Sequence, residues 1–132
     1  MIINANGVNV DTTRSNSEIN SLIDSKISSF VKIQTGSYIG NGSFGEDNPK
    51  TLTFNFVPKI VLIWKADTGM VPYSNEGWVH SLFWVTGATY STMQGRILRI
   101  SLSNKTLSIY STESASYQMN ENTMNYNWLA LG

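Results

Sequence analysis

Three glycines in the stretch IGNGSFG have the G-x-G-x-x-G spacing of loops that hold phosphate groups. A dinucleotide site requires the last glycine to open a helix, but Pro49 and the alternating run TLTFNF follow Gly45. A kinase glycine loop does lie between two strands, and Lys65 after IVLIW mimics the kinase lysine, yet the chain contains no H-R-D or D-F-G motif. We therefore predict that Gly40, Gly42 and Gly45 form a turn that binds no nucleotide.

The loop-rich segment KADTGMVPYSNEGWVH gathers aromatic, amide and carboxylate side chains. Aromatic rings stack on the apolar faces of sugars, while amide and carboxylate groups hydrogen-bond to the hydroxyls. We therefore hypothesise a sugar-binding site, with Tyr90 lining the same rim or ending a strand. The candidate ligand-binding residues are Asp67, Tyr73, Asn75, Glu76, Trp78, His80 and Tyr90.

The tryptophans also have a structural interpretation. Trp78 and Trp84 are six residues apart, so in a strand both face the same side together with His80 and Leu82. Such a face is equally typical of a hydrophobic core. We favour the core for Trp84 and leave Trp78 open between core and site.

Catalysis and metal binding have weaker support in the residue pattern. Glycosidases need paired carboxylates, and the close pairs outside the first 30 residues are Asp67 with Glu76 and Glu46 with Asp47. The second pair suits a turn, and we predict no catalytic residue. With His80 as the single histidine, no cysteine and no calcium-loop motif, we predict neither a metal nor a cofactor.

The composition excludes several classes of partner. The 132 residues include nine basic and nine acidic side chains without a Lys/Arg run, so nucleic acid binding lacks its electrostatic basis. The absence of cysteine fits synthesis in a reducing compartment, and no apolar run approaches the roughly 20 residues of a membrane span. We expect a soluble chain with a neutral polar surface, suited to a subunit of a larger assembly.

A short amphipathic helix is predicted over about 15–30, because Ser15 and Glu18 form a capping box. Its apolar stripe consists of Ile19, Leu22, Ile23, Ile27 and Phe30. At about four turns the helix would be marginal alone. The stripe is therefore expected to pack on its own domain or on copies of itself, and the sequence leaves these alternatives open.

From Val31 onward the pattern changes to the two-residue period of β-strands. The segment VKIQTGSYIG alternates with Val31, Ile33 and Thr35 on one side, TLTFNF is half-buried, and KIVLIW is apolar on both faces. Hairpins are predicted to turn at Asn104-Lys105 and near 120–123. We predict an all-β fold: an antiparallel, jelly-roll-like β-sandwich over 31–132 behind a 1–30 stem segment with the short α-helix.

One longer string, TGSYIGNGSFGEDNPKTLTFNFVPKIVLI, and the closing YNWLALG carry a family resemblance. The matching residues are Gly36, Tyr38, Gly40, Gly42, Gly45, Asn48, Pro49, Phe56, Pro58, Lys59, Tyr126, Trp128 and Gly132. They resemble the C-terminal receptor-binding domains of tail-fibre proteins in phages and prophages of Gram-positive bacteria. Residues 66–95 match no family pattern, so no family binding residue is transferred.

The resemblance implies a homotrimeric tip in the virion, made in the bacterial cytoplasm and attached to the rest of the tail fibre. It implies a bacterial cell-surface polysaccharide as partner, without membrane insertion, and in a trimer the stripe of the helix forms the oligomer interface. Two alternatives stay open. One is a structural trimerisation or capping module that ends a fibre, and the other, less favoured, is a polysaccharide depolymerase.

Overall fold

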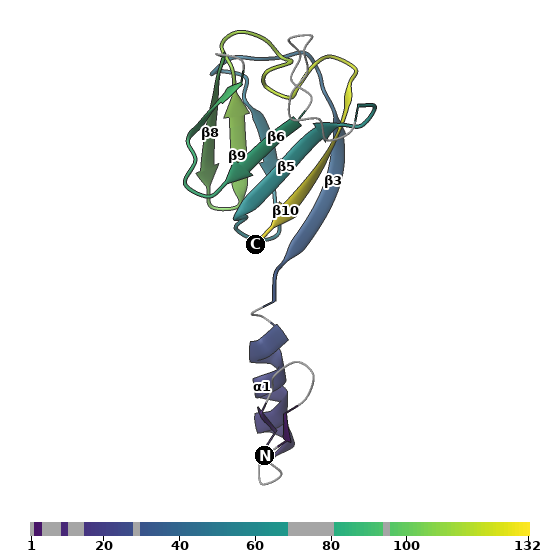
Figure 1. Cartoon of the computed structure of the whole chain (residues 1–132), viewed down its shortest axis with the longest axis vertical. Coiled ribbons are helices and arrows are strands. Elements are labelled where there is room, and N and C mark those ends of the chain that lie inside the picture. Colours follow the sequence, from purple (N-terminus) through teal and green to yellow (C-terminus); the bar gives the residue numbers. More distant parts are fainter. Residues whose placement is uncertain (1, 4–8, 11–14, 28–29, 69–80, 94–95) are drawn as a thin grey trace. The chain divides into compact units, whose positions relative to one another are not determined.

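The computed structural model describes residues 2–3, 9–10, 15–27, 30–68, 81–93 and 96–132. The chain divides into two compact units, Met1–Val31 and Lys32–Gly132. The first unit contains a two-stranded antiparallel sheet of β1 (Ile2–Ile3) and β2 (Asn9–Val10), followed by the helix α1 (Asn16–Ile27) (Figure 1).

The predicted capping box starts α1. The backbone N–H of Ser15 donates to the Glu18 carboxylate over 2.8 Å, and the N–H of Glu18 donates to the Ser15 hydroxyl over 3.4 Å. The helix ends at Ile27, three residues before the predicted end, and none of its residues is buried. Ile27 and Phe30 are 56% and 49% exposed. Within the described part of the chain, the apolar stripe is therefore partly exposed, and none of its residues is fully buried.

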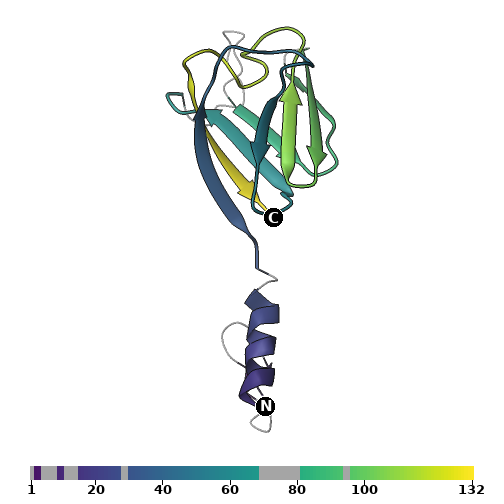
Figure 2. The ribbon, with the colours of Figure 1, turned by 180° about the vertical axis from the view of Figure 1, so that it is seen from behind.

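The second unit is an antiparallel β-sandwich of two four-stranded sheets, as the sequence predicted (Figures 1 and 2). The first sheet has the order β3-β10-β5-β6, with bounds Ile33–Ile39, Asn125–Leu131, Ile60–Lys65 and Ser81–Val85. The second sheet has the order β4-β9-β8-β7, with bounds Lys50–Thr53, Thr106–Tyr110, Arg96–Ser103 and Tyr90–Met93.

The core lies between the sheets, where alternate residues of the strands meet. Phe54, just after β4, packs edge-on against Trp128 of β10 with ring centroids 5.3 Å apart. Trp84 is buried, as predicted, and its indole N–H donates to the Ala88 carbonyl over 2.8 Å. The other fully or nearly buried apolar residues are Leu52, Phe56, Val61, Ile63, Leu82, Leu98, Ile100, Leu107, Ile109, Met119, Tyr126 and Ala130.

The predicted hairpin at Asn104-Lys105 is confirmed, since β8 and β9 pair from Ser103↔Thr106 and Asn104 has a φ of 53°. The second predicted hairpin is wrong. Residues 111–124 form no strand, and β10 instead pairs with β3 on one side and β5 on the other. The turn-like composition of residues 111–124 belongs instead to a long loop between β9 and β10. Amide side chains of this loop hydrogen-bond to neighbouring backbone.

Two predicted strand faces are also corrected. In β3 the inward positions are those of Gln34, Gly36 and Tyr38, whereas Val31 and Ile33, predicted to face inward, are 65% and 66% exposed. The strand β5 buries only one of its faces, because every second residue from Ile60 stays partly exposed. Both errors have one cause: the outer face of the first sheet is itself apolar.

The sandwich has two distinct ends. At one end, which we call the base, Lys32 and Gly132 exchange backbone hydrogen bonds of 3.1 and 2.9 Å. At the opposite loop end, β3 and β5 end and β10 begins, and the segments 40–49 and 111–124 meet there. The first strand of the sandwich, β3, therefore begins at the base and runs toward the loop end.

Candidate functional site

The glycine-rich segment at the loop end is a turn, as predicted. No helix begins at Gly45; a backbone hydrogen bond of 3.1 Å from Asn48 to Gly45 closes a turn that leads into β4. Gly42 and Gly45 have φ values of 80° and 101°, a region that favours glycine. Glu46 and Asp47 occupy this turn and are exposed, as predicted. The helix N-terminus that a dinucleotide site requires is therefore missing here.

The partner of the glycine segment is the loop 111–124. The N–H of Gly40 donates to the Met124 carbonyl over 2.8 Å, and the N–H of Thr123 donates back to Gly40 over 3.0 Å. A Cβ atom at Gly40 would lie 2.1 Å from the Glu121 carbonyl oxygen. Glycine is therefore required at this position because two backbones pass in direct contact.

Two buried amide side chains fix this contact. Gln118 is 0% exposed and donates to the Asn48 carbonyl over 2.5 Å. Asn120, 3% exposed, donates to the Ser43 carbonyl over 2.8 Å and to the Asn41 side chain over 2.6 Å. Buried amides that find such partners hold loop backbone in a single conformation. The segments 40–49 and 111–124 therefore hold one another in place, and we call these two segments the platform.

A pair of stacked tyrosines connects the first sheet to the loop 111–124. The rings of Tyr38 and Tyr126 lie 5.1 Å apart with an interplanar angle of 18°, and the Tyr38 hydroxyl donates to the Met119 carbonyl over 2.5 Å. The ammonium of Lys50 lies 3.6 Å from the centre of the Tyr38 ring, a cation–π contact. Burial raises the pKa of Tyr38 above its ordinary value and lowers that of Lys50.

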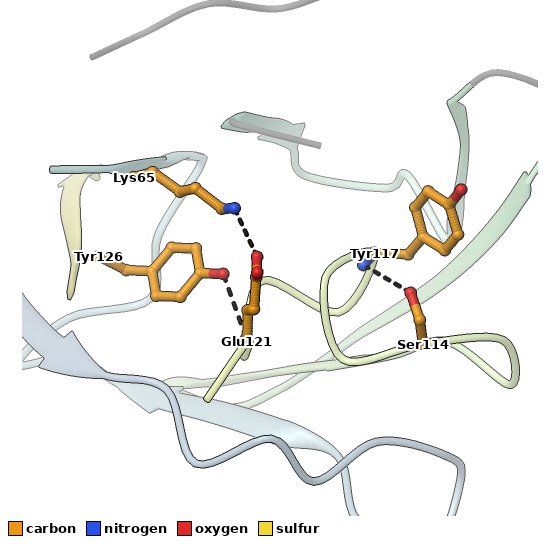
Figure 3. A network of polar contacts seen from close by, with 5 residues as sticks. All are labelled: Lys65, Ser114, Tyr117, Glu121 and Tyr126. Carbon is orange, nitrogen blue, oxygen red and sulfur yellow. Dashed lines mark hydrogen bonds and ion pairs between the residues drawn. The ribbon is translucent and has the colours of Figure 1, made fainter. Parts of the chain in front are cut away.

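An ion pair ties the loop to the first sheet (Figure 3). The ammonium of Lys65, a residue 3% exposed, lies 2.5 Å from the carboxylate of Glu121, whose side chain is 32% exposed. The N–H of Glu121 donates to the Tyr126 hydroxyl over 3.2 Å. Burial, together with the charges of the Glu121 and Asp67 carboxylates, raises the pKa of Tyr126 to about 12, although the hydrogen bond from the Glu121 backbone lowers the pKa in part. This ion pair between a buried ammonium and a loop carboxylate connects the loop 111–124 to β5.

Figure 3 also shows how the same loop is organised internally. The backbone N–H of Tyr117 donates to the Ser114 hydroxyl over 3.4 Å. Hydroxyl groups that accept from backbone three residues further along stabilise local turns. The loop is therefore held both by its own side chains and by the strands beneath it.

The predicted sugar-binding residues are described only in part. Asp67 is exposed, two residues after the end of β5, and its charge acts on Tyr126. Tyr90 is the first residue of β7, in the second sheet, whereas Asp67 follows a strand of the first sheet. The side chain of Tyr90 lies outside the described residues. The remaining candidates, Tyr73, Asn75, Glu76, Trp78 and His80, also lie outside the described residues.

The sequence-based prediction missed the residues that build the platform. Lys65 continues the inward positions of Val61 and Ile63, and a charge at an inward position signals a buried partner. Gln118 and Asn120 had no comparable signal, because polar residues in a loop are ordinary. The missed residues hold backbone and one another, so they position the loop surface and do not themselves form an open site.

The comparisons with known proteins do not identify this chain. No protein-family pattern, no curated protein and no solved structure matches it. Among the residues that the structure describes, no three His, Asp or Glu side chains gather as metal ligands. No helix in the described ranges has the length and hydropathy to cross a bilayer.

Proposed function

We propose that this chain is the receptor-binding domain of a phage tail fibre and binds a bacterial cell-surface glycan without catalysis. The observation that carries the proposal is the platform at the loop end, opposite the base where β3 begins. Binding loops on a β scaffold occupy this kind of position. A loop surface fixed in advance loses little conformational entropy on binding.

The chemistry of the platform supports a neutral, hydroxyl-rich ligand. Asn41, Ser43, Asn48, Asn122 and Thr123 are exposed around the two loops and offer donors and acceptors without net charge. Asp67, exposed two residues after the end of β5, adds a carboxylate at the loop end. A single shallow site of this kind binds weakly, so several copies on one fibre would raise the avidity.

The finer parts of the fold prediction belong to this proposal. The first strand of the sandwich, β3, pairs with the last, β10, and the second, β4, pairs with β9, a nested pairing that favours a jelly-roll-like fold. A homotrimer would cover the partly exposed stripe of α1 and would present three platforms together.

The structural alternative, a trimerisation or capping module without a ligand, is supported by a different observation. The outer face of the first sheet exposes large apolar side chains, among them Ile33 and Phe83 at 66% and 62% exposure. Such a surface favours assembly rather than sugar binding. Both roles fit one chain if assembly uses the sheet face and recognition uses the loop end.

The proposal is tested with the full chain, fluorescently labelled and mixed with intact Gram-positive cells and with their purified wall polysaccharides. We expect saturable binding that falls at least about tenfold in the triple variant Tyr73→Ala/Glu76→Gln/Trp78→Ala. Lys105→Ala, an exposed change at the base, should bind like the wild type.

Each outcome separates the hypotheses. Absence of binding to a broad panel of cells would contradict glycan recognition and favour the capping module. Unchanged binding by the triple variant would place the site elsewhere on the loop end. Release of new reducing ends from the polysaccharide would identify a depolymerase.

A further inference from the structure

The outer face of the sheet β3-β10-β5-β6 forms a continuous apolar surface. The strand register places Ile33, Leu131, Ile60 and Val85 in one row across the four strands. The next row contains Leu129, Leu62 and Phe83, with Thr35 at the edge. We call this surface the apolar face; its residues are Ile33, Ile60, Leu62, Trp64, Phe83, Val85, Leu129 and Leu131.

All eight side chains of the apolar face are partly or largely exposed to solvent. Ile33, Phe83 and Val85 are 66%, 62% and 43% exposed. None of the eight is charged or titratable. Toward the loop end the face becomes polar, because the row that contains Trp64 also contains Ser37 and Asn127. The apolar rows therefore lie nearer the base.

The second sheet shows that an outer face of this sandwich can be polar. Six of its outward positions carry Ser or Thr hydroxyl groups and Arg99 adds a charge, and we call this surface the hydroxyl face. Its residues are Thr51, Thr53, Ser101, Ser103, Thr106 and Ser108. Since sandwiches normally keep polar residues on both outer faces, the apolar face calls for a covering surface.

The size of the apolar face sets what can cover it. Four strands about 4.8 Å apart and two to three rows of side chains give an accessible area on the order of 400 Å². A standard interface buries about 800 Å² on each partner, so the face supplies roughly half of one. A second contact must contribute the rest.

The same chain offers that second contact in the stripe of α1, which is also partly exposed. We propose that the apolar face is a contact surface between copies of this chain. A face without charges needs no oppositely charged partner, so an identical face is complementary to it. The uninterrupted apolar run Ile60–Trp64 has the pattern of a strand covered on both faces, whereas in the described part of the chain only one face of β5 is fully buried.

The inference deepens the assembly part of the proposed function and does not rest on the glycan. Cell binding reports on the glycan, whereas the mass in solution reports on this contact, so each can fail while the other holds. Two or three copies would both satisfy the inference, and a dimer would contradict only the proposed trimer.

The first test measures the mass of the full chain in solution from low to high micromolar concentration. We expect a homo-oligomer whose dissociation constant weakens by about tenfold or more in Phe83→Arg/Leu129→Arg, because each arginine places a charge in the contact. The matched control Thr51→Arg/Ser101→Arg makes the same change on the hydroxyl face and should assemble like the wild type. A monomeric wild type, or equal dissociation constants in all three proteins, would overturn the inference.

A second measurement does not depend on how the arginine variants fold. The chain has no cysteine, so Val85→Cys and Ser101→Cys each introduce a single site for a spin label. Distances between labels on different copies should be shorter from the apolar face than from the hydroxyl face. The opposite order, with the copies assembled, would place the contact on the other sheet and refute the inference.

Discussion

The two outer faces of the sandwich share one backbone geometry and have opposite chemistry. On the hydroxyl face, Thr53 and Thr106 lie opposite each other with their hydroxyl oxygens 3.0 Å apart, and both remain in contact with water. On the apolar face, Leu62 lies opposite Phe83 and Leu129. The fold therefore requires neither chemistry. This difference is the observation from which we infer a contact between copies on the apolar face and solvent on the hydroxyl face.

The largest expected effect on stability comes from comparing substitutions at two neighbouring residues of β5. Ile63 is 0% exposed and faces the core, whereas its neighbour Leu62 faces outward. Ile63→Ala should lower the free energy of unfolding by about 2–5 kcal/mol, because it opens a cavity in the core. Leu62→Ala should cost less than about 1 kcal/mol in the monomeric protein.

These two variants are compared by chemical denaturation in the background of Phe83→Arg/Leu129→Arg, which keeps the copies apart. Without those arginines, Leu62→Ala should instead weaken assembly. If Leu62→Ala cost as much as Ile63→Ala in the monomer, the apolar face would be covered by its own chain, and its contrast with the hydroxyl face would disappear.

An intermediate effect is expected at the loop end. Glu121→Gln removes the carboxylate that faces the buried ammonium of Lys65, and it should lower the free energy of unfolding by about 1–3 kcal/mol. The double variant Lys65→Met/Glu121→Gln should recover part of this loss, since the buried ammonium is then removed together with the carboxylate. Denaturant titration measures both changes.

This second prediction also separates the platform from the apolar face. Neither Lys65 nor Glu121 belongs to the apolar face, so the dissociation constant of the oligomer should stay at its wild-type value. A double variant less stable than Glu121→Gln alone would show that the ion pair itself is not the source of the cost. A weakened oligomer would mean that the loop end takes part in assembly.

The sequence predicted the strands well where only one face is apolar. In TLTFNF the outward positions are polar, and Leu52, Phe54 and Phe56 face the core as predicted. In β3 the same rule failed, because Ile33 belongs to the apolar face and the inward position is held by Tyr38. A two-residue period reveals two faces of a strand, but it does not say which one is the core when both carry apolar residues.

The candidate site was predictable only in its general position. The turn at Gly40–Gly45 followed from local chemistry, because glycine and the residues after it favour turns. The pairing of Lys65 with Glu121 joins residues 56 positions apart, and nothing local in either segment specifies it. Among the sugar-binding candidates only Asp67 has a described side chain, and their joint role stays a prediction.

The smallest expected effect is the pH dependence of stability, which distinguishes unfolding of the chain from dissociation of the oligomer. Burial raises the pKa of Tyr126 from 10.0 to about 12, so between these values the unfolded chain loses this proton while the folded chain keeps it. Stability is therefore complete below pH 10 and falls as the pH rises through this window. Tyr126→Phe should make that fall shallower, whereas Tyr117→Phe, at a second partly buried tyrosine, in the loop 111–124, serves as the matched control. The apolar face contains no titratable group, so its dissociation constant should not change between pH 8 and the onset of unfolding. Equal slopes in wild type and Tyr126→Phe would contradict the role of this tyrosine, and an assembly that weakens before the fold does would place an ionisable group in the contact.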